Sequence, residues 1–108
     1  MTSKDRATLR GLARQIAEIA ARPEQGEKRE LWYAQSGLRP IRPVVFCSPE
    51  GSWVELLPDS ALTCEEEDAR QIERGLRMRL YAAQHFHDDQ VCDDSYHVYY
   101  AIEVTDWG

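Results

Sequence analysis

The chain has 108 residues, a length that suits one domain with a modest core. Hydrophobic residues make up 43% of it and charged residues 30%, a balance typical of folded proteins. The formal net charge of −6 argues against sequence-independent binding to the phosphates of nucleic acid. No apolar run approaches the ~20 residues that span a bilayer, and the polar N-terminus lacks the apolar core of a signal peptide. We therefore expect a cytoplasmic protein with no nucleic-acid or membrane partner.

Two amphipathic helices are predicted at the start of the chain. Over residues 4–22, apolar side chains recur every three or four positions and build one apolar face. Pro23 stops this helix or begins the next one. The second helix is predicted over residues 24–36, with Gly37 just beyond its end. We expect the two helices to form a hairpin.

The middle of the chain is predicted to be extended. Three prolines between positions 39 and 49 exclude a helix there. Residues 44–47, with sequence VVFC, are short, apolar and rich in β-branched residues, which predicts a buried strand. Cys47 would then be a core residue and not a nucleophile. A single helical turn is expected from Trp53 to Leu57.

A long third helix and a second strand complete the predicted elements. Thr63 and Glu66 have the spacing of a capping box, so the helix should begin after Thr63 and end near Phe86 or His87. The acidic turn at 88–94 lacks the order of a calcium-binding loop and is predicted to be a polar turn. Residues 95–104 are aromatic and β-branched, which indicates a strand beside the first one in a βαβ unit. The predicted fold class is α+β, mainly helical, as a single domain over residues 1–108.

Four pieces of the chain carry a resemblance to a known family. They are DRATLRGLARQIAEIA, EKRELWYAQSGLRPIRPVVFCSPEGSWVELLP, ARQIERGLRMRLYAAQHF and EVTDWG. Together they resemble the N-terminal region of the uroporphyrinogen decarboxylase superfamily, more closely its corrinoid methyltransferase-like branch. The resemblance implies the opening helices and first strands of a (β/α)8 barrel. Active sites of such barrels lie on loops that follow many strands, so this part would not be catalytic alone.

The resemblance also distinguishes between the branches of the superfamily. True decarboxylases carry a motif like PVWxMRQAGRY, and the positions that match it here are Pro43, Val44 and Gly51, with Trp53 in place of the tyrosine. The two substrate-binding arginines of the motif fall on Ser48 and Ser52, and serine cannot make a bidentate contact with a carboxylate. The resemblance thus implies a methyltransferase-type parent with a corrinoid protein as partner. The zinc ligands of that branch lie late in the barrel and have no counterpart here.

Two further groups of residues are candidate sites. His85, His87 and Cys92 could bind a metal ion if the helix has ended there, but histidines at a helix C-terminus also suit the negative end of its dipole. The aromatic residues that could form an interface are Tyr96, Tyr99, Tyr100 and Trp107. No catalytic residue and no cofactor site is predicted.

Three functions remain open from the sequence. The first is a non-catalytic N-terminal domain that assembles through an open surface, as a homo-oligomer or with the remainder of a barrel. The second is an independent small α+β interaction domain without catalysis. The third is a small metal-binding protein that uses histidine and cysteine.

Overall fold

The structure is a computed structural model that describes residues 2–39 and 41–96. Within these ranges the fold is all-helical, with no strand, and its four α-helices are α1 (Ser3–Ala20), α2 (Pro23–Ser36), α3 (Trp53–Leu56) and α4 (Glu67–His85). Short 3-10 turns over Glu50–Ser52 and Asp59–Ala61 flank α3. None of the helices in the described ranges is long and apolar enough to cross a membrane.

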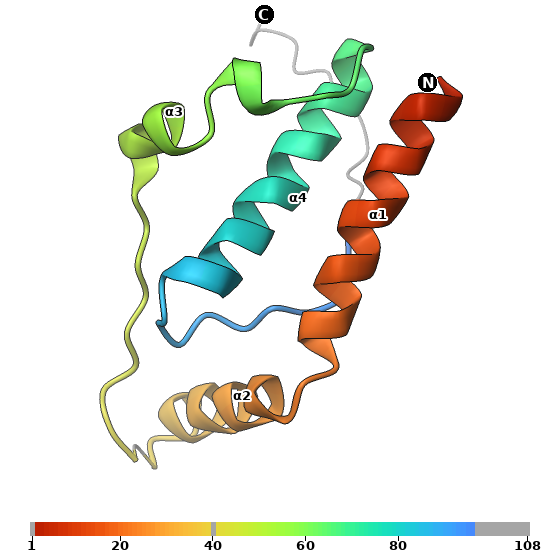
Figure 1. The fold of residues 1–108 in the computed structure, drawn as a ribbon. Helices are drawn as coiled ribbons and strands as arrows, with labels where there is room; N and C mark the ends of the chain where they lie inside the picture. Colours follow the sequence, from red (N-terminus) through yellow and green to blue (C-terminus); the bar gives the residue numbers. More distant parts are fainter. Residues whose placement is uncertain (1, 40, 97–108) are drawn as a thin grey trace, which may run out of the picture.

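Helices α1 and α4 form the core of the protein. They lie side by side and run in the same direction, and the chain between them, which includes α2 and α3, forms a long connection (Figure 1). Their apolar faces meet because each repeats apolar residues at helical spacing. The buried residues of this cluster are Leu12, Ile16 and Ile19 from α1, Leu76 and Leu80 from α4, and Cys92 beyond α4.

The predicted hairpin of the first two helices is wrong. The helix boundaries agree with the sequence, since Thr2 caps α1 and Pro23 occupies the first turn of α2. However, α2 turns away from α1 and crosses below it, whereas α4 covers the apolar face of α1 (Figure 1). The reason is the small apolar surface of α2, in which Leu31 is the buried hydrophobic residue.

The predicted α+β fold and its βαβ unit are also wrong. Residues 44–47 are extended but join no sheet, and Val45, Phe46 and Cys47 are exposed. The predicted burial of Cys47 is therefore incorrect. A strand needs a neighbouring strand, and the described residues offer none to this segment. Most of the second predicted strand, residues 97–104, lies outside the described residues.

The start of α4 differs from its prediction as well. The N-cap residue is Glu66, and Thr63 lies three residues before it without capping the helix. The backbone amide and hydroxyl of Thr63 both donate to the carboxylate of Glu73, at 3.0 and 3.1 Å. Because Glu73 binds these donors, residues 63–65 remain outside the helix.

Candidate functional site

A turn at residues 88–90, just beyond α4, holds the extended segment at residues 42–47 in place. Asp89 binds it from one side: its amide donates to the carbonyl of Val45 at 2.8 Å, and its carboxylate accepts the Val45 amide at 2.7 Å. Both terminal nitrogens of Arg42 donate to the same carboxylate, at 2.6 and 2.8 Å. The Trp32 indole from α2 donates to the Asp89 carbonyl at 2.7 Å. One residue thus joins the turn, the connection and α2.

Asp88 and Gln90 bind the next part of the connection. The Cys47 amide donates to the Asp88 carboxylate at 2.8 Å, and the Gln90 side chain donates to the Cys47 carbonyl at 2.8 Å. The backbone groups of alternate residues, Val45 and Cys47, therefore point toward the 88–90 turn, as in an extended chain. This arrangement resembles the hydrogen bonding at a sheet edge, with three side-chain contacts and the Asp89 amide in place of a neighbouring strand.

The two aspartates have a structural role that the sequence did not reveal. Asp88 and Asp89 are buried, although they belong to a turn whose sequence is strongly polar. The paired Arg42 guanidinium, together with the Val45 amide, lowers the pKa of Asp89 to about 2, so it remains ionised near neutral pH. No local pattern signals this pairing, because Arg42 and Asp89 are 47 residues apart.

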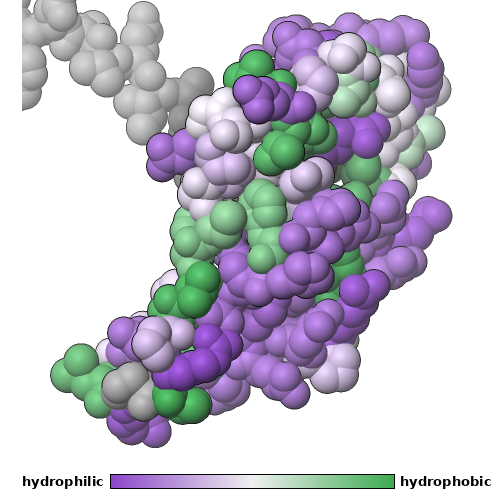
Figure 2. Space-filling model, turned by 60° about the vertical axis from the view of Figure 1, so that its left-hand side comes forward, coloured by the Kyte–Doolittle hydropathy of each residue, from purple (hydrophilic) through white to green (hydrophobic). Residues whose placement is uncertain are grey.

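The connection presents an apolar surface to solvent. Its exposed large hydrophobic residues, which we call the apolar connection, are Leu38, Ile41, Val45, Phe46, Val54 and Leu56. Figure 2, with this side turned forward, shows apolar residues in green interspersed with hydrophilic ones along the face. Exposed apolar surface gathered on one segment and bordered by polar residues is a feature of interaction sites in folded proteins.

A hollow of about 220 Å³ lies between the apolar connection and the C-terminal half of α4. Phe46 and Trp53 line it from the connection, and Phe86 lines it from the end of α4. The ring of Trp53 packs against Tyr81 and Phe86, with centroids 5.8 and 5.7 Å apart, which attaches α3 to α4. Trp53, which aligns with the tyrosine of the decarboxylase motif, thus has a packing role in this structure.

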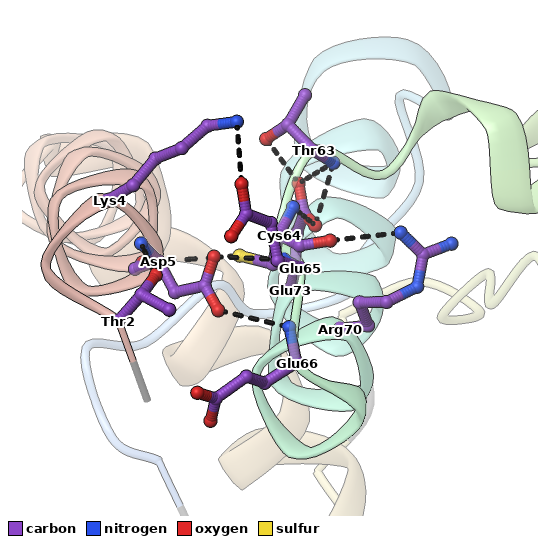
Figure 3. A network of polar contacts seen from close by, with 9 residues as sticks. All are labelled: Thr2, Lys4, Asp5, Thr63, Cys64, Glu65, Glu66, Arg70 and Glu73. Carbon is purple, nitrogen blue, oxygen red and sulfur yellow. Dashed lines mark hydrogen bonds and ion pairs between the residues drawn. The ribbon is translucent and has the colours of Figure 1, made fainter.

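A second polar cluster fixes the start of α4 (Figure 3). The buried carboxylate of Asp5 accepts the amides of Glu65 and Glu66 at 2.9 and 3.2 Å. The buried carboxylate of Glu73 accepts the Cys64 amide at 2.9 Å, in addition to the contacts from Thr63. Among the described residues no buried side-chain polar atom lacks a hydrogen-bond partner. Both carboxylates are therefore occupied in holding the fold and are not free to act as general bases.

The histidine and cysteine candidates do not converge on a metal site. The His85 ring packs on Tyr81 at a centroid distance of 4.4 Å, and His87 follows the end of α4 with a φ of 50°. Cys92 is buried, and its amide donates to Gln25 at 2.8 Å. In the part of the chain that the structure describes, no three histidine, cysteine, aspartate or glutamate residues form a group that could hold an ion.

Of the four aromatic interface candidates, the structure describes only the first. Tyr96 is half-exposed, with 50% of its surface accessible. Tyr99, Tyr100 and Trp107 lie outside the described residues. The exposure of Val45 and Phe46 was not predictable from local sequence, because residues 44–47 have the pattern of a buried strand.

The three cysteines are expected to differ strongly in reactivity. Burial, reinforced by the negative charge of Glu73, raises the pKa of Cys64 to about 11, and burial also raises the pKa of Cys92. Cys47 is exposed. We expect a colorimetric thiol reagent to modify Cys47 alone in the native protein at neutral pH, and all three thiols in urea. If the folded Cys47→Ser variant is still modified rapidly, Cys47 is not the reactive thiol.

Comparisons with protein families, curated proteins and solved structures found no match to this chain. A proposal for the function therefore depends on the side chains that the described surface presents. This surface offers an extended apolar segment, fixed by hydrogen bonds to the buried carboxylates of Asp88 and Asp89, and the described residues hold no group of metal ligands.

Proposed function

We propose that this chain is a non-catalytic assembly domain, similar to the N-terminal part of uroporphyrinogen decarboxylase-like proteins of the methyltransferase type. Its apolar connection would bind a second polypeptide, either another copy of the chain or the remainder of a barrel. For a longer parent, the resemblance suggests methyl transfer to a corrinoid protein. The serines at positions 48 and 52 speak against decarboxylation.

The observation that carries the proposal is the fixed conformation of an exposed apolar segment. Phe46 is 62% exposed and Val45 is 55% exposed, yet the backbone between Arg42 and Cys47 is held by buried Asp88 and Asp89. Ordering this segment costs conformational entropy. The exposed Phe46 ring contributes little free energy of burial to offset that cost. A pre-organised apolar segment lowers the cost of binding a partner.

The test is light scattering during size-exclusion chromatography over a range of protein concentrations. We expect a dimer that dissociates on dilution. Phe46→Glu should weaken the association about tenfold or more, since an exposed aromatic residue at an interface is a common hot spot. Tyr33→Glu is the matched control, because Tyr33 is 63% exposed on α2, outside the apolar connection.

Two outcomes would contradict assembly through the apolar connection. One is a monomer at every concentration, which would favour an independent helical domain. The other is a dimer that Phe46→Glu and Tyr33→Glu weaken equally, which would place the interface elsewhere. Circular dichroism of each variant shows whether it retains the helical fold.

A further inference from the structure

Three arginines form a stripe along the solvent side of α1. Arg6, Arg10 and Arg14 follow one another at four-residue spacing, so they lie along one face of the helix, about 6 Å apart in the direction of its axis. All three are exposed. The buried residues of α1 face α4, and α1 lies at one side of the molecule (Figure 1), so the stripe is outside the core and accessible to solvent.

The stripe lacks the partners that other arginines of the chain have. The arginines that pair with a carboxylate are Arg22, Arg42, Arg74, Arg77 and Arg79. The side chains of Arg6, Arg10 and Arg14 form no ion pair or hydrogen bond with any residue that the structure describes. Like charges four residues apart on a helix repel, so the stripe lowers the stability of α1. Unpaired charges of one sign, gathered on one face, complement a negatively charged partner.

We propose that this arginine stripe binds an acidic helix of a partner protein, whose carboxylates are one helical turn apart. The stripe is separate from the apolar connection, so the inference goes beyond the assembly function proposed above. Each guanidinium can hold one carboxylate through two parallel hydrogen bonds. Carboxylates at four-residue spacing on a second helix repeat at the same distance of about 6 Å. The exposed residues Ala7, Ala13 and Ala17 flank the stripe, and their small side chains leave room for the second helix to approach.

The surroundings of the stripe favour a short acidic partner over a long polyanion. The stripe is about 12 Å long. The exposed acidic residues 65–68 lie beside its start, where two of their amides bind Asp5. Glu18 and Glu24, both exposed, follow its other end. Nucleic acid or an anionic membrane would extend past the stripe and meet these like charges, whereas a helix with a few carboxylates opposite the stripe would not.

Fluorescence anisotropy with a labelled synthetic peptide tests the proposal. The probe is an alanine-rich peptide of about 16 residues, with glutamate at every fourth position and a side-chain cross-link on the opposite face that keeps it helical. The control peptide has the same composition and cross-link, but its glutamates are distributed over different faces. We expect the probe to bind about tenfold more tightly than the control at low salt, and its binding to weaken as salt is added.

Charge variants locate the binding surface. Arg10→Glu reverses the central charge of the stripe and should weaken binding of the probe about tenfold. Arg39→Glu makes the same change in net charge at another exposed arginine that pairs with no described carboxylate, and it should have little effect. Arg10→Gln should weaken binding and slightly raise the urea midpoint, because it removes the repulsion from Arg6 and Arg14. A purely structural role of Arg10 would instead lower the urea midpoint.

Three outcomes would overturn the proposal. The first is that the probe does not bind at low salt. The second is that the probe and the control peptide bind equally, or that Arg10→Glu and Arg39→Glu weaken binding equally, which would indicate non-specific attraction. The third is that duplex DNA or phosphatidylserine vesicles bind more tightly than the probe, with the same dependence on Arg10, which would make phosphate groups the ligand.

Discussion

Replacing Glu73 by glutamine is expected to lower the free energy of unfolding by about 3 kcal/mol, a large part of the stability of a small domain. The Glu73 side chain is fully buried and accepts hydrogen bonds from Thr63, Cys64 and Arg77. Glutamine has nearly the same volume, but it presents an amide NH₂ to donors and leaves Arg77 without its counter-charge. Urea titrations of both proteins at neutral pH give the difference directly.

The same carboxylate should make stability depend on pH. Burial would raise the pKa of Glu73, but the amides of Cys64 and Thr63 and the Arg77 side chain outweigh it and lower the pKa from 4.5 to about 2. A carboxylate with a lowered pKa in the folded state stabilises the protein fully above its unfolded pKa. This contribution is lost as the pH falls from about 4.5 toward 2. The stability difference between the native protein and Glu73→Gln should therefore shrink over that interval.

Glu18→Gln is the control for this prediction. Glu18 is exposed on α1, so its substitution removes the same charge without disturbing a buried contact. We expect its unfolding curve to match that of the native protein within a few tenths of a kcal/mol. If Glu73→Gln is as stable as Glu18→Gln, the carboxylate does not hold the residues before α4.

Replacing Asp89 by asparagine is expected to release the extended connection without unfolding the α1–α4 core. The variant loses the paired contact to Arg42 and weakens the bond from the Val45 amide. Asparagine carries no charge, and its NH₂ group would face the Arg42 guanidinium or the Val45 amide, which are themselves donors. Limited proteolysis should then cleave between residues 38 and 49 about tenfold faster than in the native protein, because cleavage requires local opening of the chain. Helical circular dichroism should change little.

Asp94→Asn provides the matched comparison, since Asp94 is exposed in the same acidic stretch. It should leave the cleavage pattern unaltered. Arg42→Lys offers an intermediate case, because lysine retains the charge but cannot make the bidentate contact. Equal cleavage rates in all four proteins would mean that the connection is held by contacts other than Asp89.

The long helices were predictable because their determinants are local. The apolar spacing of α1 and α4 and the proline at the start of α2 act within a few residues of the helices they specify. Local patterns were less informative about the start of α4. Thr63 and Glu66 have the spacing of a capping box, but Glu73, ten residues from Thr63, binds Thr63 and moves the helix start.

The fate of residues 44–47 depends on residues remote in sequence. Their apolar, β-branched composition is that of a buried strand, and the segment is indeed extended. Whether an extended segment is buried depends on its neighbours, and here these are Asp88 and Asp89, more than forty residues away. Helices complete their hydrogen bonds within themselves and can be predicted from local sequence. An extended segment obtains its partners from elsewhere in the fold, so only the three-dimensional arrangement reveals that one edge is bound and the other is open.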